Sequence, residues 1–253
     1  MGPSDPRAGF PARILPKNPL AFEQAWTAYY DALFELARHV LRAFAITLQL
    51  DDQLFFDQFM DHHASALRAI NYPAIKGNML PGQLRASAHT DYGTITILKS
   101  DGPGLQVSKD KSPPDWYDVP HIEGGFIINL GDLMRRWTND KWLSTLHRVV
   151  IPSSDVIDSW NTSSSSFTEV DTDSSNAWEV ASITDSGEVL DTHRVMRRQS
   201  LAFFHNINSD AVVHMLLDSS SSEAPKHDPI IAGDFLMQKH LASIGVAESR
   251  SEQ

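Results

Sequence analysis

The sequence predicts one mainly β domain that is supported by helices near its N-terminal end. Apolar residues recur at helical spacing early in the chain, whereas β-rich runs separated by Pro and Gly turns follow from about residue 66. Of the 253 residues, 42% are hydrophobic and six are tryptophan, so the chain can bury a sizeable core. Helices first and strands afterwards indicate an all-β core with a helical support.

The helical support is predicted for residues 20–62. From Leu20 to Phe44, apolar residues recur at intervals of three and four, which is helical periodicity over about seven turns. Asp51 or Asp52 can cap a shorter second helix. Charged residues interrupt the long apolar stretch, so it cannot span a bilayer and we expect no membrane partner.

The β core is predicted for residues of about 65–215. Residues 66–72 form its expected first strand. Residues 85–98 follow as a strand, a tight turn and a second strand in which β-branched residues alternate. Further β-rich runs begin at His147 and near Arg198. These runs predict that several chemically useful side chains lie on strands.

One folded domain is expected at 20–240, with an N-terminal extension at 1–19 and a C-terminal tail at 241–253. Within the domain, residues 153–193 differ in composition from the rest, because they contain nine acidic residues, eleven serines and neither Lys nor Arg. Such a segment buries little apolar surface, which indicates a solvated insertion. We expect this insertion to affect solubility or partners and to leave the chemistry unchanged.

Composition excludes several classes of function. The chain has no cysteine, which rules out disulfides and thiolate metal sites and leaves imidazole and carboxylate as strong ligands. The formal net charge of −11 argues against nonspecific nucleic-acid binding, which needs a basic surface. The first residues lack the apolar stretch of a signal peptide. We therefore expect a cytoplasmic protein without nucleic-acid or membrane partners, and we take it to be a monomer.

Three residues have the chemistry of a metal site. Side chains two positions apart on a strand share a face, so His89 and Asp91 are expected to point the same way. His147, at the head of a later β-rich run, can supply a third ligand. Two imidazoles and one carboxylate on one side of a metal leave the opposite positions open, which suits non-haem Fe(II) with a co-substrate and O2.

A second pair of residues fits a ligand carboxylate. Arg198 and Ser200 lie two apart on a predicted strand, and the apolar Ala202 and Phe204 continue the same face. A guanidinium fork and a hydroxyl that face inward are what a buried carboxylate requires, since a lone buried charge is very costly.

Taken in order, these motifs resemble the isopenicillin N synthase-like branch of the Fe(II)/2-oxoglutarate-dependent dioxygenases. The likeness runs from about residue 20 to about residue 239. The matching segments are residues 89–93, 129–132, 137–140, 147–150 and 198–200. The resemblance implies a double-stranded β-helix, or jelly roll, with helices packed outside it.

The resemblance also implies roles for individual residues. His89, Asp91 and His147 would bind Fe(II), while Arg198 and Ser200 would bind the far carboxylate of 2-oxoglutarate. Tyr72 lies where the family has a tyrosine that reaches the same carboxylate, although Ile70 stands where the family usually has Asn.

This chain departs from the family pattern in two places. Only 88 residues precede His89, fewer than is usual, so the substrate pocket is either shortened or completed differently. Arg198 follows His147 by 51 positions rather than closely, and the acidic insertion explains that gap.

The implied activity is oxidative decarboxylation of 2-oxoglutarate coupled to hydroxylation of a small organic molecule, with desaturation and ring closure as other outcomes. Fe(II) is the implied metal, O2 and 2-oxoglutarate are the co-substrates, and ascorbate is a candidate reductant. Two alternatives stay open. One is an oxidase of the same fold that uses iron and O2 without 2-oxoglutarate. The other is an inactive β-helix that binds a ligand or partner.

The remaining candidates have plainer interpretations. The pair His62 and His63 is expected to be solvated, and Asp132 is expected to cap a turn. Arg85 shares the predicted strand face of His89, so it lines the substrate pocket or pairs with a surface carboxylate. Phe204 is either a wall of the iron site or a core residue.

Overall fold

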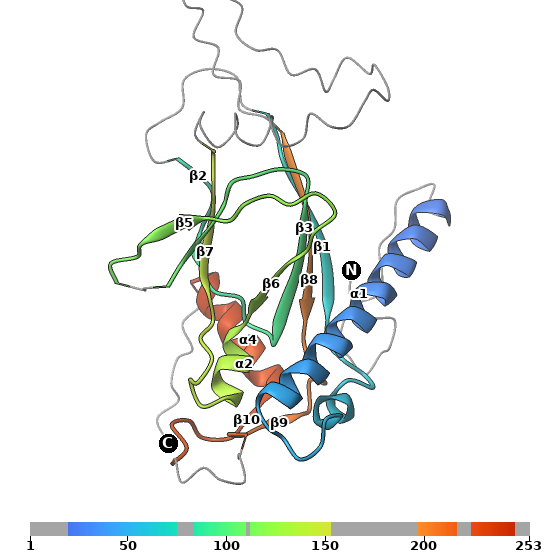
Figure 1. The fold of residues 1–253 in the computed structure, drawn as a ribbon, viewed down its shortest axis with the longest axis vertical. Coiled ribbons are helices and arrows are strands. Elements are labelled where there is room, and N and C mark those ends of the chain that lie inside the picture. The colour runs from blue at the N-terminus through green and yellow to red at the C-terminus, as the bar shows by residue number, and fades with distance from the viewer. Residues whose placement is uncertain (1–19, 75–82, 110–111, 153–196, 217–223, 246–253) are drawn as a thin grey trace, which may run out of the picture.

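The computed structural model describes residues 20–74, 83–109, 112–152, 197–216 and 224–245, which contain two facing four-stranded antiparallel sheets (Figure 1). In sheet I the strand order is β1 (Ala66–Tyr72), β8 (Arg198–His205), β3 (Ile95–Ser100) and β6 (Ile127–Leu130). In sheet II it is β2 (Leu84–His89), β7 (Leu146–Val150), β4 (Leu105–Ser108) and β5 (Trp116–Asp118). The predicted mainly β fold is confirmed, and β1 has the bounds that the sequence predicted.

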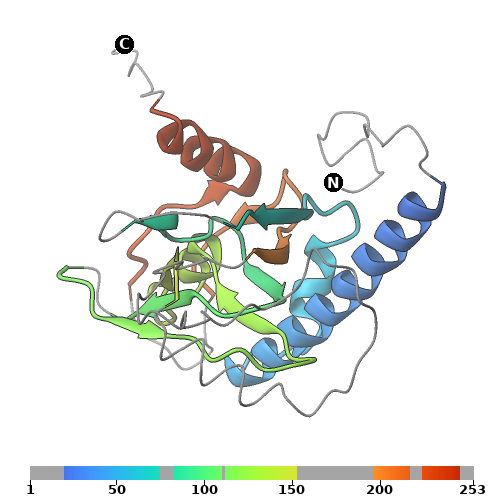
Figure 2. The same cartoon turned by 90° about the horizontal axis from the view of Figure 1, so that it is seen from above.

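Helix α1 (Leu20–Thr47) packs against the outer face of sheet I (Figures 1 and 2). Its buried residues recur every three or four positions, as the sequence periodicity predicts; they are Tyr30, Leu33, Ala37, Leu41 and Ala45. The Tyr30 ring meets the ring of Phe203 edge-on, with 5.2 Å between centroids. The packing of α1 leaves the other face of sheet I turned toward sheet II.

The second predicted helix is shorter than expected. It is the five-residue 3-10 helix η2 (Phe55–Phe59), and just before it Asp52 accepts a hydrogen bond from the backbone N of Leu54 at 2.8 Å. Arg42 of α1 donates from Nε to Oδ1 of Asp57 at 3.1 Å, which ties η2 to α1.

The strand register decides which side chains face the other sheet. Directly opposed residues of antiparallel strands point to the same face. Tyr72 opposes Arg198 in sheet I, and Ser200 opposes Ser100 in the same sheet. All four therefore lie on the inner face, whereas Phe203 faces the α1 core.

Sheet II presents one continuous row of side chains on its inner face. His89 opposes His147, His147 opposes Val107, and Val107 opposes Tyr117. Two of the predicted metal ligands thus lie side by side on neighbouring strands, opposite the face of sheet I that carries Arg198.

Two short helices and a small sheet complete the described fold. Helix α2 (Asp132–Trp137) follows β6, and a two-stranded sheet of β9 (Val212–Val213) and β10 (Ile230–Ile231) leads into α4 (Ala232–Ser243). The sequence did not predict α4, which continues beyond the domain boundary expected at residue 240.

No helix in the described ranges is long and apolar enough to cross a membrane. The acidic insertion at 153–193 lies outside the described residues.

The loop after β2 makes close backbone contact with the start of α2 at Gly131. The backbone N of Gly131 donates to the carbonyl of Thr94 at 2.9 Å, and Leu133 N donates to the carbonyl of Gly93 at 3.1 Å. A Cβ added at Gly131 would lie 2.2 Å from the carbonyl oxygen of Gly93. Only a residue without a side chain fits this crossing.

We therefore expect Gly131→Ala to lower the free energy of unfolding by roughly 1–3 kcal/mol, because the methyl group overpacks a backbone contact. Urea denaturation measures this change. Gly102→Ala is the matched control, since a Cβ there would meet nothing within 4 Å. Equal unfolding midpoints for the two variants would contradict the close crossing.

Candidate functional site

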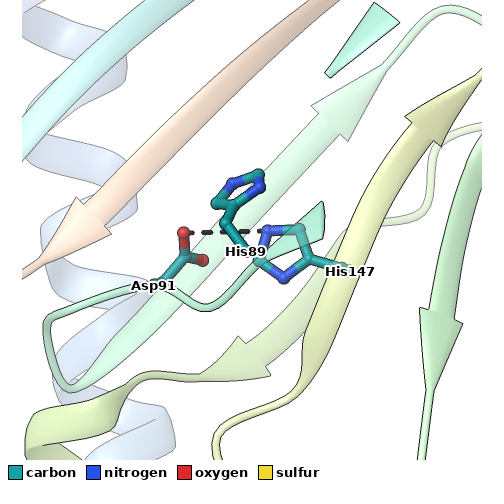
Figure 3. A group of neighbouring side chains, drawn as sticks. All are labelled: His89, Asp91 and His147. Carbon is teal, nitrogen blue, oxygen red and sulfur yellow. Dashed lines mark ion pairs between the residues drawn. The ribbon is translucent and has the colours of Figure 1, made fainter. Parts of the chain in front are cut away.

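The three predicted metal ligands meet in the structure (Figure 3). His89 is the last residue of β2, Asp91 lies in the loop toward β3, and His147 is on β7. One ligand atom from each lies within 4.8 Å of the others, and among the described residues this is the only such group of three. His147 Nε2 lies 3.7 Å from Asp91 Oδ1, and the two imidazole rings are 4.3 Å apart between centroids.

Asp91 reaches this site from a loop and not from a strand. Strand β2 ends at His89, so the expectation that both residues lie on one strand and share its face is wrong in detail. The carboxylate is held instead by Asn129 of β6, whose Nδ2 donates to Oδ2 at 2.8 Å. The backbone carbonyl of Asp91 accepts from Asp132 N at 2.8 Å. Asp91 is 6% exposed, so this orientation is fixed by buried contacts.

Both imidazoles have one nitrogen occupied by a main-chain carbonyl. His89 Nδ1 lies 2.7 Å from the carbonyl of Ser87, and His147 Nδ1 lies 2.9 Å from that of Thr145. A carbonyl can only accept, so each Nδ1 is the protonated donor. The Nε2 lone pairs are left for a metal, as in most histidine metal sites.

An ion pair between the buried Asp132 and the partly exposed Lys239 supports the segment between His89 and Asp91 from outside. The Asp132 carboxylate lies 2.5 Å from Lys239 Nζ on α4, and Thr90 Oγ1 donates to it at 3.1 Å. Burial raises the pKa of Asp132, but the Lys239 ammonium and the hydroxyl donors outweigh burial and hold that pKa below its usual range. Asp132 is thus an ionised residue that orients the segment between His89 and Asp91, and it does more than cap a turn.

Arg198 and Ser200 are buried on the inner face of sheet I, as predicted, at 3% and 4% exposure. Arg198 Nε donates to the carbonyl of Gly102 at 3.2 Å. Its Nη2 is buried and has no hydrogen-bond partner in the part of the chain that the structure describes. The guanidinium carbon lies 5.5 Å from the ring centroid of Tyr72, its cross-strand neighbour. Burial lowers the pKa of Arg198.

Arg85 lies beside the same tyrosine. Its guanidinium carbon is 5.9 Å from the Tyr72 ring centroid, and Nη2 donates to the carbonyl of Pro73 at 3.4 Å. The sequence placed Arg85 either in the substrate pocket or on the surface. The structure places it instead near Arg198, at the end of the site where the co-substrate carboxylate is predicted to bind.

The histidines at positions 62, 63 and 205 do not belong to the group formed by His89, Asp91 and His147. His62 contacts Asp61 and Asp210 through its two ring nitrogens, and His63 stacks on Phe34 with 4.1 Å between centroids. His205 is fully buried, and burial together with His63 lowers its pKa to about 3. The expectation that His62 and His63 are solvated is therefore wrong, because both are only partly exposed and contact other side chains of the fold.

Phe204 lies on the inner face in a row with Asn129. The cross-strand pairs are Phe204 with Thr96 and Thr96 with Asn129, which holds Asp91. The partial exposure of Phe204 places it as a wall of the site and not within the closed core.

Sequence reasoning missed the supporting residues. The segment containing Asn129 was noted in the motif comparison without a role for this residue, and Lys239 gave no signal because its partner is distant in the chain. Both are recognisable only once the fold brings β6 and α4 to the metal loop.

Comparison with known proteins agrees with this geometry. Residues 63–168, which contain all three candidate metal ligands, match the sequence model of the 2OG-Fe(II) oxygenase superfamily. The 2-oxoglutarate-Fe(II) type oxidoreductase hxnY of Emericella nidulans is 30% identical over 235 residues, covering 92% of this chain and 55% of that protein. Validamycin A dioxygenase of Streptomyces hygroscopicus subsp. limoneus is 34% identical over 149 residues, covering 57% and 40%.

Solved structures show the same fold. A full-length Neurospora crassa protein, crystallised in complex with alpha-KG and thymine, superposes with a TM-score of 0.72 at 29% identity, covering 96% of this chain and 63% of that one. The chain spans about half the length of the curated relatives it matches. The predicted double-stranded β-helix is therefore confirmed. By its sequence match and its fold, the chain is similar to the 2OG-Fe(II) oxygenase superfamily.

Proposed function

We propose that this protein is a non-haem Fe(II)- and 2-oxoglutarate-dependent oxygenase that hydroxylates a small organic molecule. The observation that carries the proposal is the buried Nη2 of Arg198, which has no hydrogen-bond partner among the described residues. Arg198 lies on sheet I, opposite the group formed by His89, Asp91 and His147. A buried guanidinium without a carboxylate is costly. A ligand carboxylate supplies the missing charge-assisted hydrogen bonds.

The donor set fits Fe(II). Two neutral imidazoles with free Nε2 atoms and one oriented carboxylate are the ligands expected for this ion, and the described ranges offer no fourth protein ligand to the cluster. When bound, Fe(II) supplies open positions at which a 2-oxoacid and O2 can react, so that decarboxylation of the oxoacid is coupled to oxidation of the substrate.

The residues of this chain would each contribute to binding or orientation. Asn129 keeps one oxygen of Asp91 occupied, so the other, Oδ1, is turned toward His147 and would be the oxygen that binds the metal. Arg198, Ser200 and Tyr72 would hold the distal carboxylate of 2-oxoglutarate from sheet I. The co-substrate would therefore lie between the two sheets, with its reacting end toward sheet II.

The substrate class follows from the relatives. Proline hydroxylase buaE and Validamycin A dioxygenase are both named for small molecules, and we extend only this class to the present chain. Use of O2, stimulation by ascorbate, a monomeric state and a cytoplasmic location stay predictions, as do desaturation and ring closure as alternatives to hydroxylation.

The test is an anaerobic titration of the metal-free protein with Fe(II) and then 2-oxoglutarate, followed by the weak visible charge-transfer band of a chelated 2-oxoacid. We expect the band in the native protein. In Arg198→Ala we expect the dissociation constant for 2-oxoglutarate to rise roughly 10- to 100-fold, because charge-assisted hydrogen bonds are lost.

Arg148→Ala is the matched control for this titration. Arg148 lies over the Trp116 ring at 4.1 Å on the other face of sheet II, so its loss should leave the band unchanged. Iron binding without a band would contradict the proposal and favour the oxidase that does not use 2-oxoglutarate. No iron binding would favour a non-catalytic scaffold.

Lys239 should affect iron binding from outside the site. Lys239→Met leaves the buried Asp132 carboxylate without its cation, which loosens the segment containing Thr90 and Asp91. We expect Fe(II) affinity to fall about tenfold, the lower end of the range for residues that orient metal ligands.

Lys239→Arg keeps the charge and should restore most of the affinity. Thermal unfolding of the metal-free variants separates orientation from general destabilisation. If Lys239→Met lowers the melting temperature and leaves Fe(II) affinity unchanged, the ion pair only stabilises α4.

A further inference from the structure

We propose that His205 is a positioning residue for the metal site, and that it acts through the hydroxyl of Thr94 on the loop that carries Asp91. This inference rests on the proposed function and goes beyond it, because His205 packs on the α1 side of sheet I and is not one of the candidate metal ligands. A residue outside the site would thus help to set Fe(II) affinity.

Three short contacts join His205 to Thr94. The backbone N of Thr94 donates to the carbonyl of His205 at 3.1 Å, and the Thr94 hydroxyl donates to the same carbonyl at 2.9 Å. Thr94 Oγ1 also lies 2.7 Å from His205 Nδ1. Because a carbonyl can only accept, the single hydroxyl proton is directed at it, and Nδ1 is the donor in the third contact. The His205 ring is therefore the tautomer protonated at Nδ1.

The burial of this ring is unfavourable unless its hydrogen bond matters. His205 is fully buried, and burial together with His63 lowers its pKa to about 3, so the ring is neutral at physiological pH. Its Nε2 is buried and has no hydrogen-bond partner in the described part of the chain. An apolar ring would avoid this unpaired polar atom. The hydrogen bond to Thr94 is what an apolar ring could not supply.

Packing against α1 holds the Nδ1 donor in place. The His205 ring lies 6.1 Å from the ring of Phe34 between centroids, with an angle of 16° between the two planes. The ring of His63 lies 6.2 Å away on the same basis, at 14°. A side chain whose rotamer is fixed by packing can orient its hydrogen-bond partner.

Thr94 connects His205 to the metal ligand. It is fully buried and directly precedes β3. The carbonyl of Thr94 accepts from Gly131 N at 2.9 Å, and the carbonyl of Asp91 accepts from Asp132 N at 2.8 Å. Residues 91–94 are therefore held by the start of α2 on one side and by His205 of β8 on the other. Loss of the His205 donor should loosen this segment and weaken the orientation of the Asp91 carboxylate.

The test compares anaerobic Fe(II) affinity with the melting temperature of the metal-free protein in two variants. His205→Phe keeps a ring for the stack and removes the donor, so we expect the dissociation constant for Fe(II) to rise about fivefold at an unchanged melting temperature. His205→Asn loses the ring, but its amide offers a donor near the position of Nδ1. We expect it to lower the melting temperature and to keep an Fe(II) affinity closer to that of the native protein.

This order distinguishes positioning from a merely structural role, under which the smaller Asn side chain would leave a cavity and be the worse replacement in both measurements. Thr94→Val should weaken Fe(II) binding in the same way as His205→Phe, and the double variant should bind no more weakly than the weaker single variant, because both remove one shared hydrogen bond. His63→Phe is the matched control. Its Nδ1 contacts Ser65 Oγ at 2.8 Å, so its loss should leave Fe(II) affinity unchanged.

Three results would overturn the proposal. They are native Fe(II) affinity in His205→Phe, weaker binding in His205→Asn than in His205→Phe, and additive losses in the double variant. If the native protein does not bind Fe(II), the proposed function itself fails, and this is distinguishable because the failure appears before any substitution is made.

Discussion

The orientation of one buried carboxylate, that of Asp91, governs the site. Asp91 is anchored by Asn129 from sheet I, and it faces His147 from sheet II at 3.7 Å. Its backbone is held by α2, which can approach the loop at Gly93 so closely only because Gly131 lacks a side chain. A carboxylate that is 6% exposed beside two imidazoles favours a positive charge nearby, which the proposed metal ion would provide.

The two sheets divide the chemistry between them. Sheet II holds two of the proposed metal ligands in adjacent positions, while sheet I, which is backed by α1, presents Arg198 and Tyr72, the proposed contacts of the co-substrate. Neither sheet contains a complete site. Arg85 of sheet II contacts Tyr72 of sheet I, and Asn129 of sheet I holds Asp91 beside His147 of sheet II.

The regular spacing of buried residues along helices and strands made part of the fold and of the site predictable from the sequence. The helical stripe of α1 and the alternate burial of Arg198 and Ser200 follow from local repeats, so the sequence located them correctly. The irregular features were not predictable in the same way. Asp91 lies beyond the end of β2, Arg85 lies in a bulge, and Lys239 meets Asp132 through a long-range ion pair that has no local pattern.

Fe(II) affinity of Asp91→Ala, measured anaerobically, tests the central claim most directly. The matched control is Asp118→Ala, which removes a carboxylate from sheet II that accepts a hydrogen bond from Gln106 at 3.0 Å and lies outside the metal cluster. Our account predicts that Asp91→Ala loses more than the roughly 10- to 100-fold typical of outer partners, while Asp118→Ala binds Fe(II) as the native protein does. Equal affinity in the two variants would contradict the metal site.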